Sequence, residues 1–321
     1  MNTFQEYLAE EFAEDFQEGR LARRDALKLI ASVTGSLVFA EAFLAACAPA
    51  PTPGAAIAAT PALLSTDTPS TLASTEMPQS SNSGTVRPDD PSVIAEAVEF
   101  PAGEDRIAGY LARPASAGRS PVALVCHENR GLTGHIQDVA RRLAREGYVA
   151  LAVDLLSRQG GSAAVGESNF PGVLGNQPPE QFAADFRAGW EYLGGLDFAD
   201  PARVGMVGFC FGGGVTWLVA TRMPELLAAV PFYGPHPSVA DVPKIRAAVL
   251  AIYAGRDDRI NQGIPEIEAA MQEHGKVYEK VIYPDVDHAF HNDTGSRYAP
   301  EAARDAWART LAWFDRYVRT A

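Results

Sequence analysis

The feature that most constrains the fold of this chain is an alternation of short apolar runs with amphipathic segments between residues 122 and 318. The apolar runs suit strands buried on both faces, and they cover 122–126, 148–153, 204–207, 228–232, 248–253 and 280–283. Between most of them, apolar residues recur at three- and four-residue spacing, which predicts helices over 136–145, 179–193, 213–222, 265–274 and 300–318. This alternation predicts an α/β fold with a mainly parallel sheet and helices on both faces.

The start of the folded body follows a different pattern. Two short apolar stretches, 97–100 and 107–111, are separated by Pro101, Gly103, Glu104 and Asp105, which is typical of two antiparallel strands joined by a turn. No internal repeat is visible in the chain. We therefore expect residues 92–321 to form one α/β domain.

The first 47 residues are patterned like an export signal. A polar, acidic stretch leads to Arg23 and Arg24, after which an apolar run from Leu29 to Ala46 ends at Cys47. The twin arginines resemble a Tat signal, and the residues before Cys47 resemble the lipobox of bacterial lipoproteins. This pattern predicts that residues 1–47 are a signal segment, with a lipid on Cys47 tethering the protein outside the cytoplasm.

Glu41 interrupts that apolar run, and a charged residue there disfavours membrane insertion. The alternative is an uncleaved amphipathic helix that packs on the body or dimerises, and a chain whose signal is not used would stay in the cytoplasm. The stretch 48–91 is rich in Pro, Ala, Ser and Thr and has no apolar periodicity. We expect it to be a disordered linker, because it cannot bury enough apolar surface to offset its chain entropy.

Charge and cysteine content exclude several functions. The formal net charge of -13 repels phosphate backbones, so nucleic acid is not expected as a partner. The chain has 3 cysteines without a CxxC pair, which argues against a disulfide framework or a structural zinc site. Cys126 is expected to be a buried strand residue, because unpaired cysteines pack like small apolar side chains. Small-molecule ligands remain open.

The strand predicted at 204–207 runs into Gly208-Phe209-Cys210-Phe211-Gly212, followed by a predicted helix. This is the G-x-nucleophile-x-G elbow, with cysteine in place of serine. The nucleophile of such an elbow sits in strained backbone, where side chains two positions away on either side would clash. The sequence therefore predicts Cys210 as the nucleophile and the backbone amide of Phe211 as an oxyanion donor; the alternative is a glycine-rich turn around a core cysteine.

A thiol nucleophile needs a base and a group that orients the base. Asp257 and His288 each lie just past the end of a predicted strand, in the chain order nucleophile, acid, histidine that this elbow requires. Asp258 is the alternative candidate for the acid, and His291 is the alternative candidate for the base. Either aspartate could instead simply form a turn. The remaining acids nearby could in principle bind a metal, although acidic loops are more often simply solvated; they are Asp285, Asp287 and Asp293.

The loop after the strand at 122–126 reads His127-Glu128-Asn129-Arg130. In this architecture that loop supplies the second oxyanion amide, which Asn129 could present, and Glu128 could bind the thiol or a substrate group. The alternative is that His127 and Glu128 are polar residues at a strand end that pair with Arg130 or Arg158.

These segments together resemble the dienelactone hydrolase family of α/β-hydrolases, over roughly residues 95–317. The matching stretches are 127–132, 147–156, the Cys210 elbow, 257–261, and 288–290 with Asn292 and Asp293. The resemblance implies an α/β-hydrolase fold with Cys210 as nucleophile, His288 as base and Asp257 as its orienting acid. It also implies that Glu128 holds the uncharged thiol, that the amides of Phe211 and Asn129 form the oxyanion hole, and that no metal or organic cofactor takes part.

The family's named activity opens an enol-lactone to an oxo-acid such as maleylacetate, so the resemblance implies an ester or lactone substrate. Two features depart from the family's pattern: Ala289 to Asn292 lack the arginine that helps bind the substrate carboxylate, and the signal-like N-terminus contrasts with cytoplasmic catabolism. Two other functions stay open, a tethered binding protein that has lost turnover and, less favoured, a redox thiol protein. The chain is expected to be a monomer or a small homo-oligomer.

Overall fold

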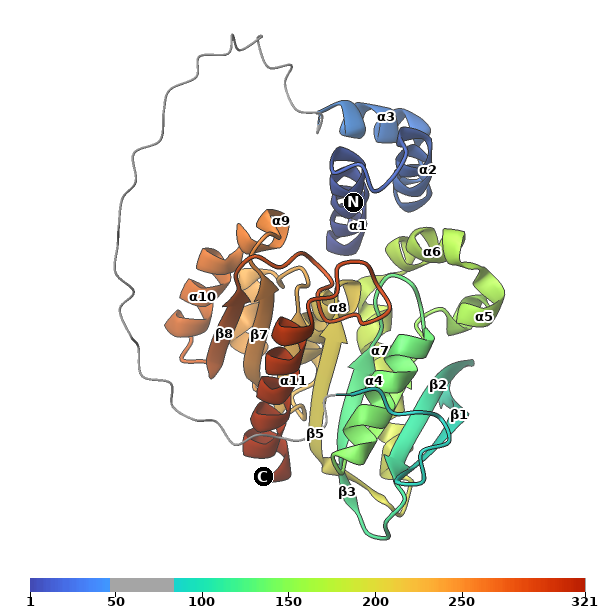
Figure 1. The fold of residues 1–321 in the computed structure, drawn as a ribbon, viewed down its shortest axis with the longest axis vertical. Coiled ribbons are helices and arrows are strands. Elements are labelled where there is room, and N and C mark those ends of the chain that lie inside the picture. The colour runs from blue at the N-terminus through green and yellow to red at the C-terminus, as the bar shows by residue number, and fades with distance from the viewer. Residues whose placement is uncertain (47–83, 321) are drawn as a thin grey trace.

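The structure is a computed structural model that describes residues 1–46 and 84–320. Its described strands form one sheet in the order β1-β2-β4-β3-β5-β6-β7-β8, shown in Figure 1. The strands are β1 (Val93–Ala102), β2 (Asp105–Pro114), β3 (Ser120–Cys126), β4 (Val149–Val153), β5 (Ala199–Phe209), β6 (Ala228–Phe232), β7 (Ala248–Ala254) and β8 (Tyr278–Tyr283). β1 and β2 pair antiparallel, β2 pairs antiparallel with β4, and the pairs from β4 to β8 are parallel.

Helices cover both faces of the sheet, as predicted. α4 (Gly134–Arg145) and α11 (Pro300–Phe314) cross the face turned to the viewer in Figure 1, while α7 (Pro179–Gly194) and α8 (Phe211–Arg222) pack together on the other. α10 (Ile264–Glu273) packs beside β8. Shorter helical segments are α5 (Ser162–Val165), α6 (Phe170–Asn176), α9 (Asp258–Asn261), η1 (Ser157–Gln159), η2 (Glu167–Asn169), η3 (Val239–Lys244) and the π-helical η4 (Asp315–Arg319).

Burial follows the position of each strand in the sheet. Every residue of β4, β6 and β7 is buried, because these strands carry neighbours on both sides and helices on both faces. The expectation of full burial is wrong for the run at 280–283. It belongs to β8, the strand at the edge of the sheet, and its residues are half-buried or exposed.

The predicted disordered linker needs one correction at its end. Most of the range 48–91 lies outside the described residues, but residues 84–91 pack against the body. Val86 is fully buried, its amide donates to Asp138 at 2.7 Å, and its carbonyl accepts from Arg141 at 2.6 Å. The folded body therefore begins before residue 92, because these contacts tie the chain to α4.

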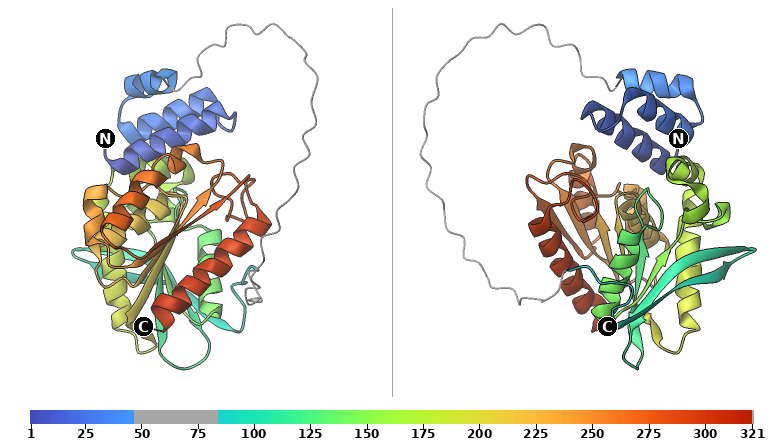
Figure 2. Two further views of the ribbon diagram at one scale, coloured as in Figure 1. Left: turned by 90° about the vertical axis from the view of Figure 1, so that its left-hand side faces the viewer. Right: turned by 45° about the vertical axis from the view of Figure 1, so that its right-hand side comes forward.

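The N-terminal segment folds into three helices, α1 (Thr3–Gln17), α2 (Arg23–Thr34) and α3 (Leu37–Ala46). They lie over the edge of the sheet where the parallel strands end, as both views of Figure 2 show. α1 buries Tyr7, Leu8 and Phe12, and α2 packs against α6. This matches the alternative of a helical segment that packs on the body, while Cys47 lies outside the described residues. Within the described part of the chain, no helix combines the length and the apolar character needed to cross a bilayer.

Candidate active site

The elbow around Cys210 has the strained geometry that its glycines predict. Cys210 joins the end of β5 to the start of α8, with φ 58° and ψ -122°. A Cβ on Gly208 would collide with the carbonyl oxygen of Gly212, and a Cβ on Gly212 would collide with the carbonyl oxygen of His127. The amide of Phe211 is the first of α8, so it has no acceptor within the helix, which is the position expected of an oxyanion donor.

The structure brings His288 and Asp257 together beside this thiol. Nδ1 of His288 lies 2.6 Å from Oδ2 of Asp257, and both side chains are buried. A ring nitrogen of His288 and Sγ of Cys210 lie within 4.8 Å of each other. Asp257 caps α9 after β7, and His288 follows β8, so each residue lies where the sequence predicts it. With Nδ1–H donated to Asp257, Nε2 faces the thiol.

The two rivals take other positions. Asp258 is exposed at the first position of α9. His291 is buried among aromatic rings, stacked on Phe209 at a centroid distance of 4.9 Å, and burial lowers its pKa well below the ordinary value. His291 is thus a neutral core residue, and the pairing with His288 belongs to Asp257.

The loop acids considered as metal ligands face cations. Asp285 and Asp287 lie 3.8 Å from the guanidinium of Arg256, and Asp293 binds His135 at 2.9 Å and also contacts Arg142. Among the described residues, one trio of side chains has the donor set of a metal site: Glu11, Cys210 and His288, whose ligand atoms lie within 4.8 Å of one another. That trio contains the predicted nucleophile and base.

The loop after β3 is organised by hydrogen bonds. His127 is buried and neutral, because burial lowers its pKa, and its Nε2 accepts from the amide of Leu155 at 3.1 Å. Its Nδ1 therefore donates to the carbonyl of Glu128 at 2.6 Å, which fixes the backbone that precedes Asn129. Oε2 of Glu128 accepts from Asn292 at 2.6 Å, and Asn129 is buried. Neither His127 nor Glu128 makes the arginine pair considered as an alternative; Arg158 instead binds Asp105 and Asp185.

Two residues that the sequence did not indicate contact the thiol. The hydroxyl of Tyr7 lies 3.1 Å from Sγ of Cys210 and 3.4 Å from Nε2 of His288. Both carboxylate oxygens of Glu11 lie 3.8 Å from Sγ. The partner of the thiol expected from the resemblance was Glu128, but its carboxylate is bound to Asn292, and α1 supplies these two contacts.

The charges around the thiol favour its neutral form. Burial, followed by the carboxylate of Glu11, raises the pKa of Cys210. Burial opposes the charged form of His288, but Asp257 and Cys210 outweigh it and raise the pKa of His288 to about 10. Burial also opposes the negative charge of Asp257, but the contact with His288 outweighs burial and lowers the pKa of the Asp257 carboxyl. The surroundings thus disfavour the thiolate of Cys210, while Asp257 stabilises the charge that His288 gains when it accepts a proton.

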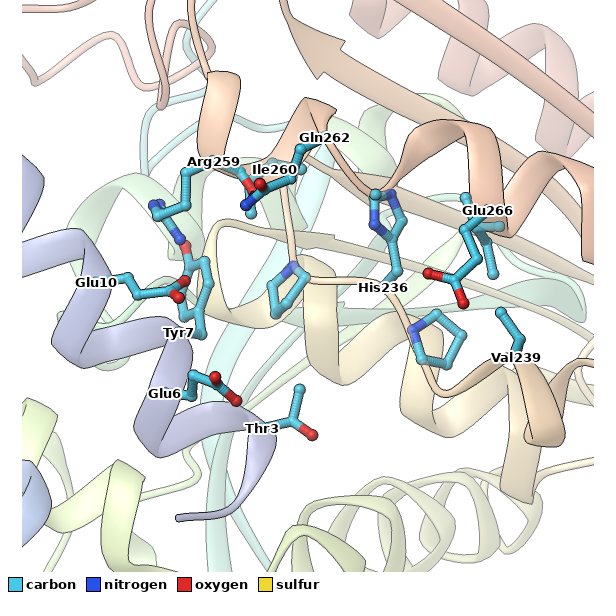
Figure 3. Close-up of a pocket in the computed structure, with 14 residues that line it drawn as sticks. Thr3, Glu6, Tyr7, Glu10, His236, Val239, Arg259, Ile260, Gln262 and Glu266 are labelled. Atoms are coloured by element: carbon cyan, nitrogen blue, oxygen red, sulfur yellow. Dashed lines mark hydrogen bonds between the residues drawn. The ribbon is translucent and has the colours of Figure 1, made fainter.

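A cavity of about 280 Å³ lies between α1 and the body, and it is lined by Tyr7, whose hydroxyl contacts the thiol. Figure 3 shows Tyr7, Glu10 and Arg259 along one side of it and His236 and Glu266 on the other. The guanidinium of Arg259 lies 4.5 Å from the centre of the Tyr7 ring, and its Nε donates to Glu14 at 3.2 Å. Its two terminal nitrogens are buried and have no hydrogen-bond partner among the described residues. No sequence pattern marks this arginine, apart from its place two residues after Asp257.

A mainly parallel sheet flanked by helices, with a strained nucleophile elbow after β5, defines an α/β-hydrolase. The model of the dienelactone hydrolase family matches residues 107–318. The chain belongs to the dienelactone hydrolase family, as its resemblance predicted.

Relatives and solved structures agree with this assignment. A protein named "Putative carboxymethylenebutenolidase" from Methylorubrum extorquens is 36% identical over 250 residues, which cover 73% of this chain and 84% of that protein. A protein of the same name from Escherichia coli K12 is 35% identical over 246 residues, covering 72% and 89%. The crystal structure of a "Putative Dienelactone Hydrolase" from Klebsiella pneumoniae superposes with a TM-score of 0.66 at 33% identity, covering 70% of this chain and 99% of that one.

Proposed function

We propose that this protein hydrolyses a carboxylic ester or lactone through a thioester on Cys210. The observation that carries the proposal is the 2.6 Å contact between His288 and Asp257 beside a cysteine in a strained elbow. A carboxylate that holds the imidazole in one tautomer, with the other nitrogen aimed at a nucleophile, is the arrangement used for acyl transfer. The names of the relatives point to the same chemistry.

In the proposed reaction, His288 takes the thiol proton and Sγ of Cys210 attacks the carbonyl carbon. The oxyanion is bound by the amides of Phe211 and Asn129, each donor lowering the barrier by roughly 2.7 to 4 kcal/mol. Collapse of the tetrahedral intermediate breaks the bond to the ester oxygen, which takes the proton from His288. Water, deprotonated by His288, then attacks the thioester, and the acid leaves as the thiol is restored. Neither step requires a metal or an organic cofactor.

We propose a small-molecule substrate that carries an anionic group, bound by Arg259. The terminal nitrogens of this buried guanidinium lack partners among the described residues, and Arg259 lines the cavity that Tyr7 separates from the thiol. The stretch Ala289 to Asn292 lacks the arginine of the family's pattern, and the amide of Asn292 is bound to Glu128. A planar guanidinium with two free nitrogens suits a carboxylate, which accepts two hydrogen bonds from it.

Turnover of aryl esters by the wild type and Cys210→Ala tests this function. The variant is expected to lose turnover at least about 10³-fold while keeping its fold. The alternative function is a protein that binds esters without hydrolysing them. In that case neither the wild type nor Cys210→Ala would turn over the ester. Unchanged turnover in Cys210→Ala would refute the assigned nucleophile.

Export with a lipid on Cys47 also stays a proposal. It is supported by the twin arginines Arg23 and Arg24, the apolar run to Ala46, and the small residues before Cys47. Expression in a bacterial host with a labelled fatty acid tests it: a labelled protein that begins at Cys47 is expected. An unlabelled chain that retains Met1 in the cytoplasm would contradict it.

A further inference from the structure

The first helix fills the space that an ester would need. Attack on a carbonyl requires the carbon to approach the nucleophile to about 3–3.5 Å. The hydroxyl of Tyr7 already lies 3.1 Å from Sγ, with the carboxylate of Glu11 at 3.8 Å. Only 3% of the surface of Cys210 is exposed to solvent. No ester carbonyl can reach the thiol while Tyr7 holds this position.

The helix is held down by residues next to the catalytic ones. Arg259, two residues after Asp257, binds Glu14 and covers the ring of Tyr7. Arg297 lies 3.7 Å from Asp15. The ring of Phe4 packs on that of Phe211, which follows Cys210, with centroids 4.9 Å apart. These contacts couple the position of α1 to the elements that carry the nucleophile and the acid.

The cavity beside α1 shows where a substrate could wait. Tyr7 and Arg259 form one of its walls, and Tyr7 also contacts the thiol, so the Tyr7 side chain stands between the cavity and Cys210. At about 280 Å³ the cavity is smaller than most ligand pockets, which measure about 300–1,000 Å³. Withdrawal of Tyr7 would enlarge it and join it to the thiol.

We propose that α1 is an intramolecular lid that limits turnover, because a substrate reaches Cys210 only while the helix is displaced from it. The inference rests on the proposed function, because it assigns Cys210 as the nucleophile that the lid covers. The match to the family model begins at residue 107, so the lid lies outside the part of the chain that this model describes. Removal of the residues before Cys47, if it occurs, would uncover the site permanently.

A charge reversal on the full chain tests the lid. Glu14→Lys places a cation against Arg259 and should loosen α1, whereas Glu18→Lys makes the same charge change at the exposed end of the helix. The readouts are the rate of alkylation of Cys210 by iodoacetamide, located by peptide mass, and kcat/KM for an aryl ester. Glu14→Lys is expected to raise both about tenfold, within the range of conformational couplings, and Glu18→Lys to leave both unchanged.

Equal alkylation rates in the wild type and a folded Glu14→Lys would overturn the lid. This readout does not depend on turnover, so it separates the two proposals. If Cys210→Ala keeps the ester activity, the proposed function fails, whereas the accessibility of the thiol still reports on α1.

A covalent lock tests the same inference in the opposite direction. A Cβ on Gly175 of α6 would lie 3.6 Å from Cβ of Val33 in α2, within the range of disulfides. In the full-length Val33→Cys/Gly175→Cys variant, oxidation should abolish turnover and reduction should restore it, while the wild type taken through the same treatment keeps its activity. An oxidised variant that turns over at the rate of its reduced form would show that the helices need not move.

Discussion

The hydroxyl of Tyr7 lies 3.1 Å from Sγ of Cys210, although 203 positions of sequence separate the two residues. The contact places the first helix of the chain beside the proposed nucleophile of a domain whose family match starts a hundred residues later. Two consequences follow for the chemistry. The Tyr7 side chain covers the thiol, and the neighbouring carboxylate of Glu11 disfavours the thiolate.

Asp257 should matter for catalysis far more than its neighbour in sequence. Asp257→Asn is expected to lower kcat about 10³- to 10⁴-fold, because the amide cannot hold His288 in the required tautomer or stabilise its charge. Asp258→Asn, a matched change at an exposed position, should leave kcat within about twofold, as expected of a surface site. Steady-state kinetics on one aryl ester compare them, and equal losses in both variants would contradict the pairing.

Glu11→Gln should lower the pKa of the Cys210 thiol. Burial is the largest cause of the raised thiol pKa, and the carboxylate of Glu11 is the second. The glutamine side chain is uncharged, so the substitution removes the second cause. The pH profile of Cys210 alkylation measures the change, and its midpoint is expected to move to lower pH. A looser lid alone would raise the rate at every pH without moving the midpoint, so an unmoved midpoint would contradict the electrostatic role of Glu11.

Arg259 should discriminate between anionic and neutral substrates. Arg259→Met is expected to raise KM for an ester bearing a carboxylate about tenfold or more relative to its neutral analogue, since a charge-assisted bidentate pair is lost. The variant also loosens α1, but that change affects both esters alike, so the ratio of their kcat/KM values isolates the recognition of charge. An unchanged ratio would remove Arg259 from substrate binding.

His236 should make the stability of the fold depend on pH. Its Nε2 lies 2.9 Å from the hydroxyl of Tyr253, and burial lowers its pKa from 6.5 to about 4. Between these values the unfolded chain binds more protons, so the free energy of unfolding falls as the pH drops from 6.5 to 4, by on the order of 3 kcal/mol for this group.

Urea unfolding of the wild type and His236→Gln at pH 7 and pH 5 measures this contribution. The glutamine keeps a polar partner for Tyr253 but does not titrate, so its loss of stability on acidification should be smaller than that of the wild type. The same loss in both proteins would show that His236 titrates normally.

The sequence predicted the catalytic body well because its signals are local. The glycines that flank Cys210 predict the elbow, and Asp257 and His288 each follow a strand that is recognisable from its run of apolar residues. The position after a strand favoured Asp257 but left Asp258 as a close rival, since both residues fit a turn, and the structure separates them by burial.

What the sequence did not indicate depends on contacts between distant segments. No local sequence pattern marks Tyr7 or Glu11 as neighbours of Cys210. The spacing of apolar residues in α1 predicts a buried face but does not indicate which part of the protein that face contacts. The contact between Val86 and α4 was missed for the same reason: it is a single buried side chain in a polar stretch. The role of β8 as edge strand is likewise fixed by the order of the sheet.

In the proposed reaction Cys210 becomes acylated during turnover, and the mass of the trapped intermediate shows whether it does. The full-length protein is mixed with an activated aryl ester, quenched in acid within the first turnovers, and digested for peptide mass. One acyl group is expected on the peptide that contains Cys210, and no such adduct in Cys210→Ala. Hydrolysis by the wild type without an adduct on Cys210, or with the adduct on another residue, would contradict it.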